Sequence, residues 1–440
     1  MKIIKLGKDS RQALGELLAK RNPSQYGTYA DTVNEIVENV RKNGDAALFA
    51  YTEQFDGCKV DRDNVLVTEE EIAEAYEKVD EELLSVIRKA LVNIRAFHEK
   101  QRRYSWFDSS EEGILLGQKL TPLNRVGVYV PGGKAVYPSS VLMNIVPARV
   151  AGVREIVMTT PPGRDGSLNP AVLVAAKEAG ADRIFKAGGA QAVASLAFGT
   201  ESIPKVDKIV GPGNIFVALA KKAVFGFVSI DSIAGPSEIL VLADETANPR
   251  YVAADLLSQA EHDEMASAIL VTTSKKLAGE VNREIDGFLK ELSRREIMEK
   301  SLDTYGCILL ADNLEEAVSA VNDIASEHLE IMTRDAFTVM TKIRNAGAIF
   351  IGDHSCEPLG DYFAGPNHVL PTNGTAKFFS PLGVDDFVKK SSIISYSREA
   401  LEPIHEDIMR FAVKEGLTAH ENAIKVRFAQ EGNHGKDGDN

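Results

Sequence analysis

Residues 125–134 read RVGVYVPGGK, a short apolar run that ends in a proline and two glycines. An apolar run that leads through a glycine turn into a helical pattern is typical of a βα unit with a buried parallel strand. Similar runs follow at 156–160, 183–186, 208–210 and 239–242, and helical stretches around 140–151, 170–179, 190–198 and 214–225 separate them. The sequence therefore predicts an α/β fold built on a parallel sheet.

A second series of the same kind is predicted downstream, joined to the first around Gly235-Pro236-Ser237. Its strands are expected near 267–273, 306–310 and 347–351, and its helices near 250–261, 275–294, 314–325 and 334–344. The first hundred residues read instead as helical, with a capping box from Thr68 to Glu71 and an amphipathic stretch over 80–101. The tail from 397 to 430 reads as two helices broken at Gly416.

Length and composition narrow the class of protein. A chain of 440 residues is too long for one simple core, and 44% hydrophobic with 26% charged residues is ordinary for a globular protein. The net charge of −14 argues against nucleic acid or an anionic membrane as the main partner. The N-terminus lacks the apolar core of a signal peptide, and no run of about 18 apolar residues occurs. We expect a cytoplasmic protein that acts on small molecules.

Three glycine-rich loops follow predicted strands, at 131–134, 187–191 and 210–214. None has the GxGxxG pattern, and Lys134 is not followed by the serine or threonine of a Walker motif. The first loop alone fits a structural turn as well as a phosphate site. Three such loops at one edge of a sheet favour a nucleotide ligand.

Polar residues with metal-binding or proton-transfer chemistry occur in four short segments. Gln259 and His262 are three residues apart at the end of a predicted helix, so they share a face and could hold one ligand together. Glu327-His328 sets a carboxylate beside an imidazole, which suits proton transfer. The segments 360–368 and 415–420 offer further partners. A single histidine is more often structural than a ligand, but the four segments together favour a site.

The three cysteines do not contribute to this expectation. Cys58, Cys307 and Cys356 have no CxxC spacing, so a metal would be held by nitrogen and oxygen. Cys356 precedes the 360–368 loop, but nothing in its context marks it as an activated nucleophile. We therefore expect Cys356 to have no catalytic role.

Taken together, these segments resemble the histidinol dehydrogenase family. The resemblance extends through RVGVYVPGG at 125–133, IDSIAGPSE at 230–238, SQAEH at 258–262, SEHL at 326–329, LGDY at 359–362 and EGLTAH at 415–420. Asp263 is the one local departure, because a small residue is expected after His262. Six ordered motifs over about three hundred residues make the resemblance specific.

The resemblance implies an architecture of two incomplete Rossmann-like domains with small helical N- and C-terminal domains. A helical arm would occupy 1–25, and a Rossmann-like domain with the substrate and metal residues would comprise 26–128 plus 239–382. An NAD-contacting Rossmann-like domain would occupy 129–238. The C-terminal helical domain at 383–440 would be exchanged with the partner subunit of a homodimer with shared active sites.

The resemblance also implies roles for individual residues. Zinc would bind Gln259, His262, Asp361 and His420. The substrate would contact the same four residues together with Ser237, His328 and Glu415. NAD would contact Tyr129, Gln191 and Asn214. His420 and Glu415 would come from the C-terminal segment of the other subunit. The implied reaction is the NAD-dependent oxidation of L-histidinol, through L-histidinaldehyde, to L-histidine. His328 would act as the base and Glu327 would activate water.

Other functions remain open at this stage. The same base and metal would serve an NAD-dependent dehydrogenase of another amino alcohol or a polyol. A zinc hydrolase would use Glu327 to activate water without a redox cofactor. A non-catalytic metal-binding or nucleotide-binding module would leave the adjacent Glu327 and His328 unexplained.

Overall fold

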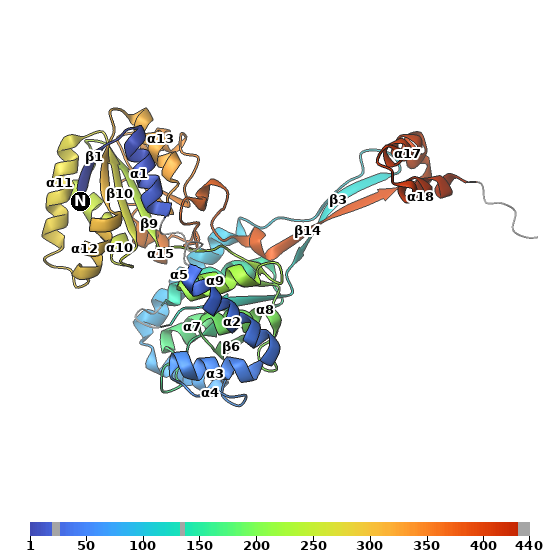
Figure 1. The fold of residues 1–440 in the computed structure, drawn as a ribbon, viewed down its shortest axis with the longest axis horizontal. Coiled ribbons are helices and arrows are strands. Elements are labelled where there is room, and N and C mark those ends of the chain that lie inside the picture. The colour runs from blue at the N-terminus through green and yellow to red at the C-terminus, as the bar shows by residue number, and fades with distance from the viewer. Residues whose placement is uncertain (20–26, 133–136, 430–440) are drawn as a thin grey trace, which may run out of the picture. The chain divides into compact units, whose positions relative to one another are not determined.

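The computed structural model describes residues 1–19, 27–132 and 137–429, which form two compact units (Figure 1). Unit 1 comprises Met1–Arg102 and Pro122–Phe387, and unit 2 comprises Arg103–Thr121 and Val388–Asn440. Unit 1 contains two parallel sheets flanked by helices, so the predicted α/β class is confirmed. Gly133 and Lys134 of the first glycine-rich loop lie outside the described residues.

A five-stranded parallel sheet forms from the first βα series, in the order β6-β5-β4-β7-β8. Its strands are β4 (Arg125–Tyr129), β5 (Glu155–Thr160), β6 (Arg183–Lys186), β7 (Lys208–Val210) and β8 (Ser229–Ile230). The helices between them are α6 (Pro138–Ala151), α7 (Pro170–Ala179), α8 (Gly189–Phe198) and α9 (Ile215–Val224). The predicted helices of this series are confirmed, and so are its predicted strands except the run at 239–242, which forms a strand of the other sheet. The strand β8 was not predicted.

Four helices from the first hundred residues pack against α6 to α9. They are α2 (Gly27–Asn43), α3 (Asp45–Asp56), α4 (Glu69–Lys78), which has the predicted capping box at Thr68, and α5 (Glu81–Glu99). Their apolar faces share two cores with the five-stranded sheet. The structure therefore differs from the expectation that residues 26–128 and 239–382 form one domain. The apolar stripes of these helices are buried against the five-stranded sheet instead. A boundary at 128 would also cut β4.

A six-stranded parallel sheet forms the second half of unit 1, in the order β1-β11-β10-β9-β12-β13. Its strands are β1 (Lys2–Lys5), β9 (Glu238–Ala243), β10 (Ser267–Thr272), β11 (Cys307–Leu310), β12 (His328–Met332) and β13 (Ala348–Ile351). Its helices are α1 (Lys8–Ala19), α10 (Pro249–Ala260), α11 (Lys275–Phe288), α12 (Arg295–Tyr305), α13 (Leu314–Ile324), α14 (Ala336–Met340) and α15 (Glu357–Tyr362).

The sequence pattern missed two strands of this sheet. β1 pairs with β11, so the N-terminal segment begins as a strand where only a helical arm was expected. β12 lies between β9 and β13 and is buried along its whole length. It contains His328 and Glu330, and these polar side chains interrupt the apolar run that marks a buried strand.

Unit 2 contains an antiparallel pair, β2 (Trp106–Asp108) with β3 (Ile114–Pro122), in a three-stranded sheet completed by β14 (Val388–Tyr396). Three helices follow, α16 (Arg398–Leu401), α17 (His405–Lys414) and α18 (Thr418–Phe428). The predicted break at Gly416 is confirmed, and this glycine has a φ of +75° between α17 and α18. The strand β14 was missed, because the C-terminal domain was expected to be helical.

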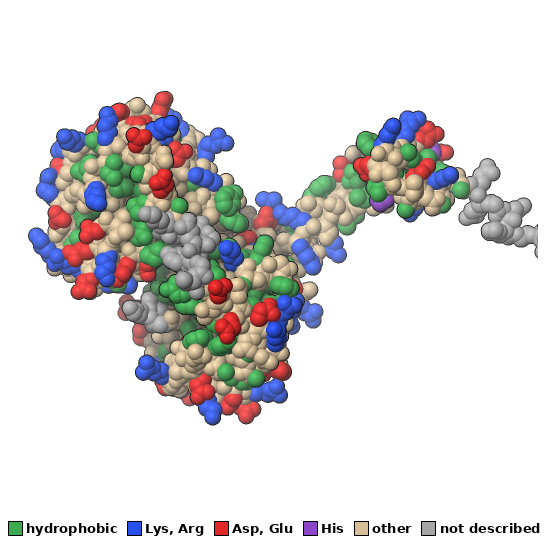
Figure 2. Space-filling view, viewed as in Figure 1, with side chains coloured by type: hydrophobic (Ala, Val, Ile, Leu, Met, Phe, Trp, Pro, Cys, Tyr) green, Lys and Arg blue, Asp and Glu red, His purple; other side chains and the backbone are tan. Residues whose placement is uncertain are grey.

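Unit 2 buries little of its own surface. Ala412 is its one buried residue among those described, whereas large apolar side chains such as Trp106, Ile394 and Phe411 are more than half exposed. Figure 2 shows hydrophobic side chains at the surface of this unit. Within the described ranges of the whole chain, no helix is both long and apolar enough to cross a bilayer.

Asp56, the last residue of α3, provides a test of pH-dependent stability. Burial raises its pKa from 3.8 to about 6, and its Oδ2 atom is buried with no hydrogen-bond partner in the described part of the chain. A carboxylate at a helix C-terminus is also repelled by the helix dipole. Because the pKa is higher in the folded protein, the stabilisation is present below pH 3.8 and is lost as the pH rises through about 6.

We therefore expect Asp56→Asn to raise the melting temperature at pH 7.5 and to have little effect near pH 4. Thermal unfolding followed by circular dichroism at both pH values measures this difference. An Asp56→Asn variant that is less stable than the parent protein at pH 7.5 would contradict the assignment.

Candidate active site

A pocket of about 630 Å³ lies within unit 1. It is lined by segments at the carboxyl ends of strands in the five-stranded sheet and at the amino ends of strands in the six-stranded sheet. The five-stranded sheet contributes segments that follow the carboxyl ends of β4, β7 and β8. The six-stranded sheet contributes segments at the amino ends of β9 and β12 and at the end of α10. The pocket is lined by Ser237, Gln259, His262, Glu327, His328 and Asp361, and by Asn214 from the other sheet.

Glu327 and His328 are held by the backbone of Glu238 on the neighbouring strand. The Glu238 N–H donates to Oε2 of Glu327 over 2.9 Å, and Nδ1 of His328 lies 3.1 Å from the Glu238 carbonyl oxygen. A carbonyl only accepts hydrogen bonds, so Nδ1 must carry a proton and donate it. In the neutral imidazole the lone pair is then on Nε2, which has no hydrogen-bond partner within the described residues. This geometry leaves His328 with one basic nitrogen in the pocket.

Burial and neighbouring charges shift the pKa values of both Glu327 and His328. Burial raises the pKa of Glu327 to about 8. Burial alone would lower the pKa of His328, but the carboxylates of Glu327 and Asp361 outweigh it and raise that pKa to about 10. Nδ1 of His328 lies 3.6 Å from Oε2 of Glu327, and Nε2 lies 3.7 Å from Oδ1 of Asp361. The imidazole therefore has a strong affinity for a proton at Nε2.

Asp361 lies on α15 and faces three histidines. Burial alone would raise the pKa of its carboxyl, but His328, His368 and His262 together lower it to about 2. Gly360 is required beside it, because a Cβ there would come within 2.6 Å of the Phe350 ring. Asp361 is therefore an ionised carboxylate among imidazoles.

The residues near Asp361 form a donor set that fits a metal ion. One ligand atom from each of His262, Glu357 and Asp361 lies within 4.8 Å of the others. The side chain of Gln259 is fully buried, and neither its amide oxygen nor its nitrogen has a hydrogen-bond partner in the part of the chain that the structure describes. An orphaned buried amide is costly unless a ligand satisfies it. Nitrogen and oxygen donors of this kind suit zinc.

Glu357 was missed by the sequence analysis. It begins α15, and its carboxyl accepts a hydrogen bond from the Ser258 hydroxyl over 2.9 Å and lies 3.9 Å from Nε2 of His262. Burial raises its pKa to about 7. A Cys-Glu-Pro sequence gives no motif or spacing that marks a ligand, so only the fold reveals this neighbour of the metal residues.

Two further buried carboxyl groups, those of Glu330 and Asp255, lie near Glu357. Oε1 of Glu330 on β12 accepts the backbone N–H of Glu357 over 2.9 Å, and the Glu330 carboxyl lies beside the buried carboxyl of Asp255. Two carboxylates next to each other in the interior repel, which favours a proton on one of them. Burial and the nearby Asp255 raise the pKa of Glu330 well above its ordinary value.

The residues expected to contact NAD lie at the loops of the five-stranded sheet. Tyr129 ends β4 and is buried, and its hydroxyl accepts the Gly189 N–H over 3.2 Å. Gln191 on α8 is 1% exposed, and both polar atoms of its amide lack a partner among the described residues. Asn214 caps α9 with its Oδ1 and lines the pocket. The described lining does not include Tyr129 or Gln191.

The remaining sequence-predicted residues lie elsewhere or have structural contacts. Glu415 at the end of α17 and His420 in the first turn of α18 belong to unit 2 and are exposed. Asp263 lines the pocket, and its Oδ1 accepts the backbone N–H of Met265 over 2.8 Å, which closes the turn after α10. Cys356 occupies the N-cap position of α15.

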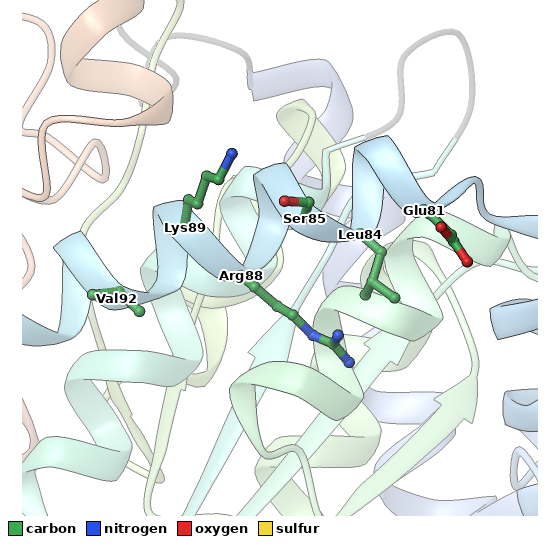
Figure 3. A pocket seen from close by; sticks show the side chains of 6 residues that line it. All are labelled: Glu81, Leu84, Ser85, Arg88, Lys89 and Val92. Atoms are coloured by element: carbon green, nitrogen blue, oxygen red, sulfur yellow. The ribbon is translucent and has the colours of Figure 1, made fainter.

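A second cavity, of about 480 Å³, lies along α5 (Figure 3). Figure 3 shows that its six labelled side chains all come from this one helix. Its arginine, Arg88, is already bound through two nitrogens to Glu178, over 3.0 and 2.8 Å. This cavity therefore lacks the convergent chemistry of the pocket in unit 1.

The role of Glu330 predicts a contrast between two substitutions. Glu330→Ala should destabilise the protein by about 2–4 kcal/mol, because it leaves the Glu357 N–H unsatisfied in a cavity. Glu330→Gln should cost much less, since its amide can accept from Glu357 and brings no negative charge beside Asp255. Urea unfolding midpoints of both variants measure the contrast. Equal losses for the two variants would argue against a proton on this pair of carboxyls.

The chain is similar to known proteins over most of its length. A family model described as histidinol dehydrogenase matches residues 19–428. The histidinol dehydrogenase of Clostridium acetobutylicum is 54% identical over 428 residues, which cover 97% of this chain and 99% of that protein. The histidinol dehydrogenase of Bacillus subtilis (strain 168) is 59% identical over 396 residues, covering 90% of this chain and 92% of that protein.

A solved structure gives the same assignment. The crystal structure of histidinol dehydrogenase from Elizabethkingia anophelis matches with a TM-score of 0.91 and 37% sequence identity, covering 97% of this chain and 98% of that chain. Sequence and fold therefore agree along nearly the whole polypeptide. This chain belongs to the histidinol dehydrogenase family.

Proposed function

We propose that the chain catalyses the NAD-dependent, four-electron oxidation of L-histidinol, through L-histidinaldehyde, to L-histidine, the last steps of histidine biosynthesis. The observation that supports this most is the position of His328. Its basic Nε2 is buried in the pocket without a hydrogen-bond partner from the described residues, beside the Glu327 carboxyl and the metal-fitting residues. A hydrolase would need the water-activating carboxylate but not this second base.

His328 is the base of the first oxidation. An alcohol carbon releases hydride only as its hydroxyl proton departs, so a base must accept that proton. The Nδ1–H of His328 is fixed on the Glu238 carbonyl, which directs Nε2 to receive it. The carboxylates of Glu327 and Asp361 stabilise the imidazolium that results.

Glu327 acts in the second oxidation. The aldehyde must add water before it can lose a second hydride, and Glu327 accepts a proton from that water. Burial raises the pKa of this carboxyl to about 8, which matches a group that gains and loses a proton near neutral pH. His328 then accepts the hydroxyl proton of the hydrate, so one base serves both oxidations.

The donor set beside Asp361 fits zinc, and the unpartnered Gln191 amide with the pocket-lining Asn214 suits a dinucleotide. Gln259, His262 and Asp361, with His420 of the partner subunit, would hold zinc. The zinc would orient the imidazole and amino nitrogens of the substrate and would offset the negative charge of Asp361, which favours neutral His328. Tyr129, Gln191 and Asn214 would contact NAD, and one NAD+ would be needed as hydride acceptor for each of the two oxidations. Ser237 and Glu415 would complete the substrate pocket.

The surface of unit 2 supports a homodimer with shared active sites. Its described residues bury almost nothing within one chain, although it carries exposed apolar side chains including Trp106, Phe107, Ile394 and Phe411. Apolar surface on that scale is typical of a subunit interface. A second copy of the chain would cover it and would bring Glu415 and His420 to the other subunit. The cytoplasmic location stays a prediction.

The direct test counts NADH with L-histidinol as the limiting substrate. We expect two NADH per L-histidinol, loss of turnover after treatment with a chelator, and recovery when zinc is added back. Absorbance at the NADH band measures the yield, and elemental analysis of the same samples measures zinc. One NADH per substrate would contradict the four-electron reaction, and full activity in metal-free protein would contradict the role of zinc. Hydrolytic turnover without NADH would favour a zinc hydrolase instead.

A further inference from the structure

An ion pair between Lys221 and Asp231 lies in the interior of the five-stranded half of unit 1. Lys221 is on α9, Asp231 follows β8, and their side chains are only 3% and 4% exposed. The Lys221 ammonium also donates to the Gly211 carbonyl over 3.0 Å. Asp231 accepts the Gly211 N–H over 2.8 Å and the Ser232 N–H over 2.7 Å. The pair therefore holds Gly211 by both its N–H and its C=O.

The backbone at Gly211 accepts no other residue in this conformation. Its φ is +117°, and a Cβ there would come within 2.0 Å of the Tyr129 carbonyl oxygen. The loop after β7 is thus packed directly on the end of β4. Glycine makes this approach sterically accessible, but it also gives the loop more conformations to choose from. The ion pair selects one of them.

Stability alone does not account for a buried pair of this kind. Removing two charges from water costs several kcal/mol per ion, and an apolar pair of similar volume often serves stability as well or better. What the Lys221–Asp231 pair supplies is specific geometry. It provides three hydrogen bonds to the backbone at Gly211 and Ser232.

Both segments held by the pair continue into the pocket. Residues 211–215 line it where the loop after β7 enters α9, and residues 231–232 and 234–237 line it between β8 and β9. Glycine-rich backbone before a helix, at the carboxyl edge of a parallel sheet, is the usual place for the pyrophosphate of a dinucleotide. Lys221 itself is not among the described lining residues, so it acts on the pocket through Gly211 and Asp231.

We propose that Lys221 and Asp231 are positioning residues that hold residues 211–215 and 231–232 in the shape that binds the nicotinamide dinucleotide. This inference rests on the proposed NAD dependence. It distinguishes the ion pair from Glu327 and His328, since loss of the pair should weaken dinucleotide binding and leave proton transfer intact.

The test substitutes Lys221 and measures binding without turnover. Lys221→Met removes the hydrogen bond to Gly211 and leaves Asp231 without its partner, so the Kd for NADH should rise by about tenfold, the loss of one charge-assisted hydrogen bond. NADH fluorescence or calorimetry on the zinc-loaded protein measures this Kd. The KM for NAD+ should rise similarly, whereas zinc content, the Kd for L-histidinol and kcat at saturating NAD+ should stay within twofold.

Lys208→Met is the matched control. Lys208 is a buried lysine at the opposite, amino end of β7, where its ammonium lies 3.2 Å from the Asp386 carboxylate. Its substitution removes an ion pair of a buried lysine on the same strand, with a partner carboxylate that is 36% exposed, and should leave the Kd for NADH unchanged. If Lys221→Met does not fold, Lys221→Met combined with Asp231→Asn removes the unpaired charge. The double variant should still bind NADH about tenfold more weakly, because the bond to the Gly211 carbonyl is lost.

Three results would overturn the inference. If wild-type protein binds NADH and either Lys221 variant binds it within twofold of wild type, the pair does not position the dinucleotide loops, and the proposed function is unaffected. If the wild-type protein binds no nicotinamide dinucleotide, both the proposed function and the inference fail. An equal rise in the Kd for NADH in Lys208→Met would also contradict the inference, because it would assign the effect to general loss of stability.

Discussion

The backbone of Glu238 is the constraint on which the site depends. Its N–H donates to the Glu327 carboxyl and its carbonyl accepts from Nδ1 of His328, so two adjacent side chains at the start of β12 are fixed by one residue of the neighbouring strand β9. The parallel register of β9 and β12 makes this possible, because it pairs His328 with Ile239. One carboxyl and one imidazole are thereby held in different hydrogen-bonding states within a single buried pocket.

The pocket is lined by the carboxyl ends of strands from one parallel sheet and by the amino ends of strands from the other. Loops at the carboxyl ends of the five-stranded sheet are rich in glycine and backbone N–H groups, as a dinucleotide requires. The amino edge of the six-stranded sheet supplies the side chains that can bind a metal or a proton. The three histidines that face Asp361 lower its pKa, whereas burial and the nearby Asp255 raise the pKa of Glu330. The electrostatics of the pocket are thus set by residues from several elements at once.

Periodicity in the sequence predicted most of the fold because most strands are plain apolar runs, such as β4 and β5. β12 escaped prediction because His328 and Glu330 interrupt its apolar pattern, and these are residues that give the pocket its chemistry. β1 and β14 are exposed edge strands whose pairing partners lie far away in sequence. The placement of α2 to α5 could not be read from amphipathic spacing, which says that a helix face is buried but not against which sheet.

Some residues of the candidate site have a local signal in the sequence, and others do not. The helical spacing of Gln259 and His262 and the adjacency of Glu327 and His328 are local, and the sequence displays both. Glu357 and the Lys221–Asp231 pair have no local signature, since their partners are brought to them only by the fold. The orphaned amide of Gln259 likewise depends on burial, which one sequence does not display.

Glu327 and His328 are held on one backbone residue, and we propose that they act in different steps of the two oxidations. Glu327→Gln tests it most directly, because glutamine can still accept the Glu238 N–H but cannot take a proton from water. Single-turnover rates of NADH formation from L-histidinol and from L-histidinaldehyde should separate the steps. We expect aldehyde oxidation to fall by about 10²–10⁴-fold and alcohol oxidation to stay within about tenfold. Equal losses in both steps would contradict it.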